Sequence, residues 1–335
     1  MKVLVTGGAG YIGSHVLIEL LNNGYEPVVV DNFSNSSPSN IDAVKKICGA
    51  NIPFSCGDIT NKKIVRELFL LHKFDSVIHL AGLKSIKESF NYPLKYYKNN
   101  VMASLTLLEV MQEFDVKNIV FSSSATVYGQ PSNLPITESM QVQSPINPYG
   151  KSKLLIETIL DDLYVSDNGW RIIKLRYFNP IGAHQSGLIG ENNLRGANNI
   201  MPMILEVACG EKEKLTIYGN DYETQDGTGV RDYIHVEDLA KGHIRALKRI
   251  QEKKGNLAIN LGTGKGHSVL DLVKTFEEAT GKKIPYKFSE RRSGDIACCY
   301  TDSSHSKKIL NWTANKNLKE MCLDSWRWKL KNYNN

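Results

Sequence analysis

A glycine-rich turn follows the first apolar segment of the chain and restricts the folds available to it. Residues Thr6-Gly7-Gly8-Ala9-Gly10-Tyr11-Ile12-Gly13 separate an expected buried strand, Lys2 to Thr6, from an expected helix. Gly7, Gly10 and Gly13 permit a tight turn, and they let backbone N–H groups approach a pyrophosphate at the positive end of that helix. This context predicts the first strand–turn–helix unit of a dinucleotide-binding fold.

Short apolar runs alternate with amphipathic stretches through the first half of the chain. Continuous apolar runs are typical of a parallel sheet that is covered on both faces. Helical spacing separates them, as over Val101 to Met111 and Leu154 to Leu163, so we predict a doubly wound, Rossmann-like α/β fold. The expected strands cover Lys2 to Thr6, Glu26 to Asp31, Ile52 to Cys56, Asp75 to Ala81, Asn118 to Ser123 and Arg171 to Phe178.

The pattern changes after Phe178. Residues Asn179 to Asn199 are rich in Gly, Asn and His and lack periodicity, and the later strands are short. We therefore expect a first domain over 1–178 and a second, smaller α/β lobe over 179–335. A strand–helix–strand pattern from Tyr233 through Gly262 leaves open a return of part of 230–262 to the first domain. The second lobe is expected to contain a helix near Met201 to Cys209, strands near Leu215 to Tyr218 and Ile284 to Phe288, and a terminal helix from about Leu318.

The composition excludes several classes of protein. With 335 residues, 41% of them hydrophobic, the chain suffices for one large or two ordinary globular domains. The net charge of +6 is dispersed, which favours small anionic ligands over nucleic acid. Six cysteines without a Cys-x-x-Cys pair, and eight histidines without metal-ligand spacing, predict reduced thiols and no structural metal. We find neither a hydrophobic leader nor an apolar run of roughly 18 residues, so we expect a soluble cytoplasmic protein.

Asp31 ends the second expected strand, 18 residues after Gly13, where a carboxylate can bind the adenine ribose hydroxyls. The same charge would repel a 2'-phosphate, which favours NAD over NADP. Further strand ends carry candidate contacts to adenine, pyrophosphate and ribose, because ligands gather at the carboxyl ends of parallel strands. A loop or capping role is the alternative for each of these residues, which are Asp58, Ile59, Leu80, Ala81, Gly82, Lys84 and Asn99.

Tyr149 and Lys153 lie four residues apart and would share one face of a helix. A tyrosine that acts as a base near pH 7 needs its pKa lowered by roughly 3 units from about 10, and one cation at about 4 Å supplies roughly that effect. Ser124 ends another expected strand, and its hydroxyl can orient the substrate oxygen that Tyr149 deprotonates. The alternatives are a chance surface spacing for the pair and a cap or loop role for the serine.

Several segments together make the chain similar to the extended short-chain dehydrogenase/reductase family, and within it to the UDP-glucose (UDP-galactose) 4-epimerases, from end to end. Six segments carry this resemblance, namely Thr6 to His15, Phe121 to Gly129, Tyr149 to Lys153, Leu175 to Pro180, Gly227 to Val236 and Arg291 to Asp295.

The resemblance implies a tightly held NAD that acts as a catalytic group and is not consumed. Tyr149 would take the proton of the sugar 4-hydroxyl while a hydride passes from C4 to the nicotinamide. The 4-keto sugar would then rotate, and the hydride would return to its opposite face. Residues 1–178 would then bind NAD and residues 179–335 the UDP-sugar. The implied cofactor contacts are Gly7, Gly10, Tyr11, Ile12, Gly13, Asp31, Asn32, Asp58, Ile59, Leu80, Ala81, Gly82, Lys84, Asn99, Ser122, Tyr149, Lys153, Tyr177 and Phe178.

On the substrate side, the resemblance implies that Arg231 and Arg292 neutralise the diphosphate and that Asp295 holds the uridine ribose. Without the family match, either arginine would be read as a solvated surface charge. The complete implied set is Lys84, Ser124, Tyr149, Asn179, Asn199, Ile200, Thr216, Ile217, Tyr218, Arg231, Tyr233, Arg292, Asp295 and Cys299.

Two positions depart from the pattern of relatives. Cys299 would stand at the pocket wall, where epimerases restricted to glucose and galactose sugars tend to carry tyrosine. A cysteine leaves room for an acetamido group, so we expect UDP-GlcNAc and UDP-GalNAc as further substrates; the alternative is a small buried hydrophobe without such a role. Leu80 replaces an aromatic residue of some relatives, and we attach no functional consequence to it.

Two other functions compete with the epimerase. A sugar-nucleotide 4,6-dehydratase or decarboxylase would carry one or two carboxylates where this chain has Ala125 and Thr126. A non-catalytic dinucleotide sensor would keep the glycine turn and lose Tyr149, Lys153 and Ser124. The resemblance also implies a homodimer through helices near Asn99 to Asp115 and Gly150 to Asp167.

Overall fold

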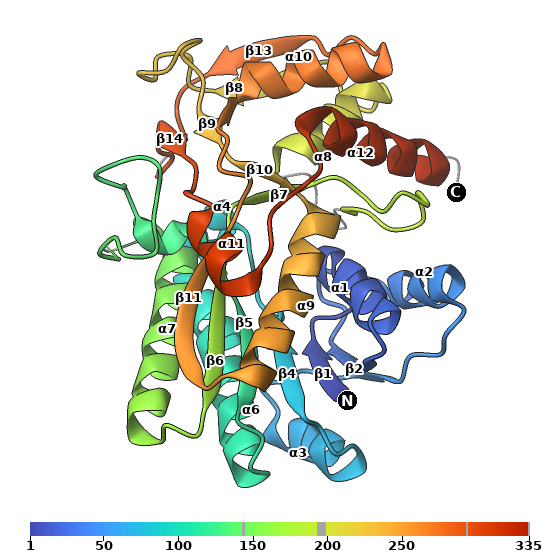
Figure 1. Cartoon of the computed structure of the whole chain (residues 1–335). Helices are drawn as coiled ribbons and strands as arrows, with labels where there is room; N and C mark the ends of the chain where they lie inside the picture. Colours follow the sequence, from blue (N-terminus) through green and yellow to red (C-terminus); the bar gives the residue numbers. More distant parts are fainter. Residues whose placement is uncertain (143–144, 193–198, 293, 334–335) are drawn as a thin grey trace.

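A parallel sheet runs through the centre of the molecule, with helices on both of its faces (Figure 1). The structure is a computed structural model that describes residues 1–142, 145–192, 199–292 and 294–333. Within this part of the chain, the central sheet has the strand order β11-β6-β5-β4-β1-β2-β3. Its strands are β1 (Lys2–Thr6), β2 (Glu26–Asp31), β3 (Phe54–Cys56), β4 (Ser76–His79), β5 (Asn118–Ser124), β6 (Arg171–Tyr177) and β11 (Gly255–Leu261).

Alternate residues of β1 enter two separate cores, which explains the continuous apolar runs. Val3 and Val5 pack with helices α1 (Tyr11–Asn22), α2 (Pro38–Cys48) and α9 (Val236–Glu252). Leu4 faces the other way, into a core shared with α3 (Lys62–Leu71), α6 (Met102–Glu113) and α7 (Pro148–Ser166). The predicted doubly wound fold is confirmed.

Of the strand–helix–strand segment from Tyr233 through Gly262, only the second strand joins this sheet. Strand β11 pairs in parallel with β6, from Gly255 opposite Arg171 to Leu261 opposite Tyr177. Strand β10 (Tyr233–His235) instead pairs with β7 (Asn179–Ile181) in a separate two-stranded sheet. The edge strand β3 is also shorter than expected, since it has a neighbour on one side only and Phe54 is exposed.

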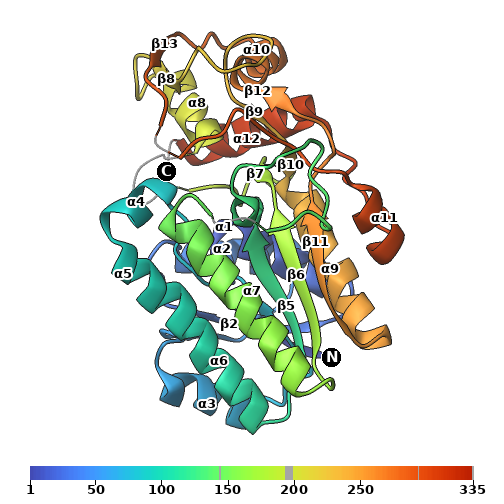
Figure 2. The ribbon, with the colours of Figure 1, turned by 90° about the vertical axis from the view of Figure 1, so that its left-hand side faces the viewer.

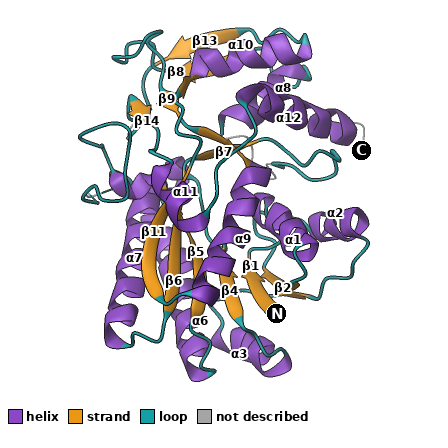
Figure 3. Ribbon diagram, viewed as in Figure 1, coloured by secondary structure: helices purple, strands orange, loops and turns teal. Residues whose placement is uncertain are grey.

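The remaining elements lie above the carboxyl ends of the central strands, as Figures 1 and 2 show. Two small sheets, β12-β9-β14 and β13-β8, are combined with helices around a third core that includes Met201, Leu215 and Phe276. Figure 3 shows how short these strands are beside the central ones. Their bounds are β8 (Leu215–Tyr218), β9 (Val230–Arg231), β12 (His267–Ser268), β13 (Tyr286–Ser289), β14 (Cys298–Cys299), α8 (Ile200–Ala208), α10 (Val269–Thr280) and α12 (Leu318–Tyr333).

Two short helices and a π-helical turn precede α6, and the helix expected from about Asn99 begins in that π-helical turn. They are α4 (Ile86–Asn91), α5 (Pro93–Tyr96) and the π-helix Tyr97–Val101, and the chain also forms a 3-10 helix (Ala125–Tyr128) after β5 and a helix α11 (Ser304–Leu310). Residues 193–198 of the expected loop, and Ser293 of the last matched segment, lie outside the described residues. No helix among the described residues is both long and apolar enough to cross a membrane.

Candidate active site

A cavity of about 840 Å³ lies between the carboxyl ends of the central strands and the smaller sheets. Its lining includes every residue for which the sequence predicted a catalytic, cofactor or substrate role, from Gly7 of the glycine turn to Cys299 of β14. The predicted cofactor contacts and the predicted substrate contacts share Tyr149, and one continuous cavity contains both. The individual roles stay predictions.

The glycine turn forms a cradle that larger residues would fill. Gly7 has a positive φ of 71°, and a Cβ built on it would lie 2.8 Å from the backbone nitrogen of Ala81. A Cβ on Gly13 would lie 2.4 Å from the carbonyl oxygen of Gly7. Backbone therefore packs on backbone here, and the first turn of α1 faces the cavity with unobstructed N–H groups, as a bound pyrophosphate requires.

Asp31 organises the far end of this cradle. One of its carboxylate oxygens accepts a hydrogen bond from Ala9 N at 3.0 Å, and the other accepts from Phe33 N and from Ser36 Oγ at 2.8 Å. Beyond it, the side chain of Asn32 donates to Asp58. Ser34, Asn35 and Ser36 line the cavity here without having been predicted, because a short polar loop after a strand has no distinctive sequence pattern.

Helix α7 presents Tyr149 and Lys153 to the cavity. Its first turn is fixed by Pro148 and by the Asn147 side chain, which accepts a hydrogen bond from Gly150 N at 2.8 Å. The ammonium of Lys153 donates to Ser122 O at 2.7 Å and lies 4.9 Å from the ring centroid of Phe121, against 6.0 Å from that of Tyr149. Lys153 is therefore fixed beside β5, one turn from the phenol.

The pKa of Tyr149 differs from the sequence-based expectation. Burial raises it above the ordinary value, and a hydrogen bond with Ser124 opposes that rise only partly. Burial also lowers the pKa of Lys153 to about 8, against the opposing effect of Glu157. The expected lowering of the tyrosine pKa by Lys153 is thus absent from the protein alone, because desolvation of the phenolate outweighs the stabilising contacts.

A buried ion pair between Glu157 and Arg176 contacts the elements that carry Ser124, Tyr149 and Lys153. Glu157 lies one turn beyond Lys153 on α7, and Arg176 Nη2 of β6 donates to it at 2.6 Å. The same carboxylate accepts from the hydroxyl of Ser123 at 2.5 Å. Because Ser123 precedes Ser124, this pair ties the end of β5 to the helix that carries Tyr149.

Arginines of the smaller sheets reach the other side of the cavity. The guanidinium of Arg292 lies 4.0 Å from the ring centroid of Tyr218, and Arg231 is 3.8 Å from a carboxylate oxygen of Asp295. Arg231 is further held by the carbonyl oxygen of Val230 at 2.9 Å. Arg231 is thus anchored and Arg292, although exposed, is stacked on Tyr218, so that both cations border the cavity where an anion could bind.

Glu191 links the two sides of the site and was not predicted. It accepts hydrogen bonds at 2.7 Å from the ammonium of Lys84 and from the side-chain amide of Asn199, and it is 7% exposed. Asn199 therefore leaves the N-terminus of α8 without a side-chain cap, so that the first turn at Ile200 faces the cavity. A lone acid in an aperiodic stretch gives no signal in one sequence.

Cys299 lies on the cavity wall beside Ala125, the residue that follows Ser124. Its side chain is buried in a cluster with Ala125, Tyr128 and Phe178, at the edge of the cavity. Burial raises the pKa of this thiol to about 11, which keeps it neutral and small. The position therefore contributes little volume to the wall.

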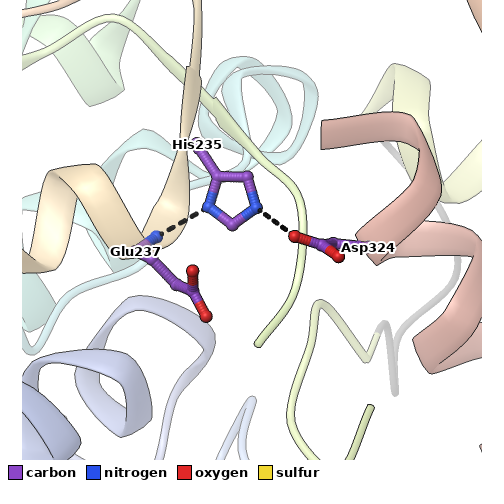
Figure 4. Close-up of side chains that lie close together, drawn as sticks. All are labelled: His235, Glu237 and Asp324. Carbon is purple, nitrogen blue, oxygen red and sulfur yellow. Dashed lines mark hydrogen bonds and ion pairs between the residues drawn. The ribbon is translucent and has the colours of Figure 1, made fainter. Parts of the chain in front are cut away.

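His235 of β10, Glu237 of α9 and Asp324 of α12 lie close together (Figure 4). Glu237 N donates to one ring nitrogen of His235 at 3.0 Å, so the other nitrogen carries the hydrogen that points at Asp324, at 3.1 Å. The ammonium of Lys316 lies 2.7 Å from both carboxylates. The cation of this cluster is thus Lys316, and both histidine nitrogens are used without a metal.

A parallel sheet with a glycine cradle after its first strand, and a Tyr-x-x-x-Lys pair beside the cradle, defines the short-chain dehydrogenase/reductase class. The family model described as GDP-mannose 4,6 dehydratase matches residues 4–325. A UDP-glucose 4-epimerase of Bacillus subtilis is 53% identical, over 100% of this chain and 98% of its own, and that of Homo sapiens is 51% identical, over 99% and 97%.

Among solved structures, the UDP-glucose 4-epimerase of Bifidobacterium longum in complex with NAD+ and UDP superposes with a TM-score of 0.97 at 49% identity, covering 100% of this chain and 99% of that one. The chain belongs to the extended short-chain dehydrogenase/reductase family and, within it, to the UDP-glucose 4-epimerases.

Proposed function

We propose that this chain is an NAD-dependent isomerase that interconverts UDP-glucose and UDP-galactose by inverting C4 of the sugar. One observation carries the proposal: Tyr149 and Ser124 stand where the glycine cradle and the cleft with Arg231 and Arg292 open into one cavity. A base is thereby placed between a dinucleotide site and a diphosphate site.

The residues present fit NAD. The glycine turn lines the cavity at the start of α1, where a pyrophosphate would bind, and Asp31 places a carboxylate at the end of β2 that suits a free ribose hydroxyl. These residues would hold NAD, and the bound cofactor would supply reversible hydride acceptance for C4 of the sugar. Everything else in the reaction falls to the side chains.

Tyr149 accepts the proton of the sugar 4-hydroxyl, and Ser124 orients that oxygen by hydrogen bonding. Lys153 keeps a positive charge one helical turn away while the proton moves. The uridine diphosphate is held by Arg231, Arg292 and Asp295, far from the reacting carbon. This distribution leaves the keto sugar free to turn about its bond to the diphosphate and present its other face.

We further propose that the enzyme accepts UDP-GlcNAc and UDP-GalNAc. The support is the small, neutral side chain of Cys299 in the wall beside Ala125 and Phe178. A tyrosine there would occupy the space that an acetamido group at C2 needs. The division of the chain into an NAD-binding part over 1–178, completed by α9 and β11, and a UDP-sugar-binding part over 179–335 belongs to the same proposal.

A cytoplasmic homodimer is also proposed. Apolar side chains project from three neighbouring helices, namely Leu94 of α5, Met102 of α6, and Leu155 and Val165 of α7. Leu94 is 81% exposed and Val165 is 84% exposed in the single chain. Figure 2 shows α5, α6 and α7 side by side on one face. A second copy of the same face would cover these side chains.

The chain lacks the carboxylate that a dehydratase would carry after Ser124. Ala125 and Thr126 occupy the two positions after Ser124, and both line the cavity. Neither residue can donate or remove a proton at the adjacent carbon of the sugar, so elimination of water has no carboxylate to assist it. The sensor alternative would not need the buried support that Glu157 and Arg176 give to the catalytic residues.

The decisive experiment mixes purified protein with UDP-galactose, without added NAD, and follows the appearance of UDP-glucose. Tyr149→Phe is expected to lower kcat by about a thousandfold, because the base is lost while the cavity is kept. Tyr164→Phe, on the same helix α7, is the matched control and should leave kcat unchanged. A UDP-4-keto-6-deoxy sugar as product would support the dehydratase, and unchanged UDP-galactose the sensor.

A further inference from the structure

The hydroxyl oxygen of Ser124 is fully engaged as an acceptor. A hydroxyl group has two acceptor lone pairs and one hydrogen to donate. The backbone N–H of Thr126 donates to Ser124 Oγ at 3.2 Å, and the Thr126 hydroxyl donates to the same atom at 2.9 Å. Ser124 therefore has only its own hydrogen left, and it can act toward other groups solely as a donor.

That remaining hydrogen has a target in the site. Ser124 and Tyr149 line the same cavity, and the Ser124 hydroxyl lowers the pKa of a phenol that burial otherwise raises. A donor stabilises the phenolate more than the phenol. The two hydrogen bonds from Thr126 withdraw charge from Oγ, which makes the serine a stronger donor.

Thr126 also contacts the turn that carries Tyr149. A Cβ built on Gly150 would lie 3.1 Å from the carbonyl oxygen of Thr126 and 3.2 Å from its hydroxyl oxygen. The backbone that follows Tyr149 thus packs directly on Thr126. Thr126 thus binds Ser124 directly and lies beside Gly150, the residue after Tyr149, from a position on the cavity wall.

We propose that Thr126 is a positioning residue, which holds Ser124 as a dedicated hydrogen-bond donor toward Tyr149 and the sugar oxygen. This inference rests on the proposed function and adds a residue to its mechanism. Around Tyr149, the other titratable groups are Lys153 on α7 and Tyr177 on β6, with His243 of α9 hydrogen-bonded at 2.5 Å behind Tyr177. Changes at Thr126 leave all three groups present.

The test compares Thr126→Val, which removes the hydroxyl at constant size, with Thr126→Ser, which keeps it. In the holoenzyme with UDP-galactose, Thr126→Val is expected to lower kcat about tenfold, since one hydrogen bond that supports a developing charge is lost. KM should not change, and the limb of the pH–rate profile that belongs to Tyr149 should move to higher pH. Thr126→Ser should restore both the rate and the profile.

Thr158→Val is the matched control, because this exposed threonine of α7 donates only to the carbonyl oxygen of Leu154 in its own helix. In a Ser124→Ala background, Thr126→Val should cause no further loss, since Thr126 acts through that serine. Thr126→Ala serves as a second hydroxyl-free variant should the valine variant fail to fold.

A second readout does not depend on turnover. Ultraviolet difference titration, with Tyr149→Phe as the blank, should give a higher pKa for Tyr149 in Thr126→Val and in Ser124→Ala. An unchanged profile and titration in Thr126→Val, or a full additional loss in the Ser124→Ala background, would overturn the proposal. An inactive wild type would instead refute the proposed function.

Discussion

Under the proposed function, Cys299 would set the space beside C2 of the sugar, so substrate choice would depend on this one residue. We expect Cys299→Tyr to abolish turnover of UDP-GlcNAc and UDP-GalNAc while UDP-glucose and UDP-galactose still react. The physical reason is steric: Cys299 lines the cavity, so a ring at this position would occupy space beside the sugar. Initial rates with all four nucleotide sugars, measured side by side, check the expectation.

Cys299→Ala is the control for this substitution, because it removes the thiol without adding volume, and it should keep all four rates. If the tyrosine variant lost the acetylated and the plain sugars to the same extent, Cys299 would not be a gate.

Site residues could be predicted from the sequence where they belong to a spaced motif, and not where they stand alone. Gly7, Gly10 and Gly13 follow a strand at a spacing that few other structures need, and Tyr149 with Lys153 adds a second spaced motif. Glu191 and Ser36 have no such pattern, and their roles depend on partners far away along the chain or in a loop. The pKa of Tyr149 was also misjudged, because desolvation is a property of the packed protein and not of helical spacing.

Among the elements, α12 combines apolar contacts of Leu318, Met321 and Cys322 with one buried carboxylate, that of Asp324. Asp324 accepts from His235 at 3.1 Å and from Lys316 at 2.7 Å, and it also pairs with Arg327. Burial alone would raise the pKa of Asp324, but the hydrogen bonds from His235 and Lys316 outweigh it and hold the pKa well below the ordinary value. Deleting this charge leaves Lys316 with Glu237 as its remaining partner.

We therefore expect Asp324→Asn to lower the free energy of unfolding by about 3 kcal/mol at pH 7, as measured by urea denaturation. Since the pKa is lower in the folded state, the stabilisation is present above the unfolded value of about 4 and is lost as pH falls toward the folded value. The difference between wild type and variant should shrink accordingly below about pH 4.

Asp42→Asn removes a 74% exposed carboxylate that is 3.8 Å from Lys45, and it should change the stability by less than about 0.5 kcal/mol. A variant Asp324→Asn as stable as wild type at pH 7 would mean that α12 is held by its apolar contacts alone.

The elements themselves were predictable where hydrophobic pattern and glycine punctuation agree, as for β1, β2 and β8, whose bounds match those expected. The pairing partner of β10 was not predictable. A three-residue strand can pair with either sheet, and the position of β7 (Asn179–Ile181) beside β10 determines which sheet it joins. The π-helical turn before α6 was not predicted for a similar reason. Its backbone follows the contact of Asn100 with Leu83 and Ser152, which no local pattern encodes.

At the scale of the whole molecule, the exposed apolar face of α5, α6 and α7 gives a test of assembly. We expect the protein to sediment as a dimer, and Leu155→Glu to weaken association by about a hundredfold or more, because an unpaired carboxylate would be buried at the contact. Leu155 is 46% exposed in the single chain. Analytical ultracentrifugation over a range of concentrations measures the effect.

Leu330→Glu offers the matched control, since Leu330 of α12 is 50% exposed and lies outside that face. A dimer that Leu155→Glu leaves intact would place the contact elsewhere on the surface.

The chain passes between the central sheet and the smaller sheets after β6, after β10 and after β11. Three covalent connections at one boundary restrict a rigid-body opening of the cavity between the two parts. Evolution of new sugar preferences on this framework would then proceed by exchanging individual wall residues, without any need to redesign a moving lid.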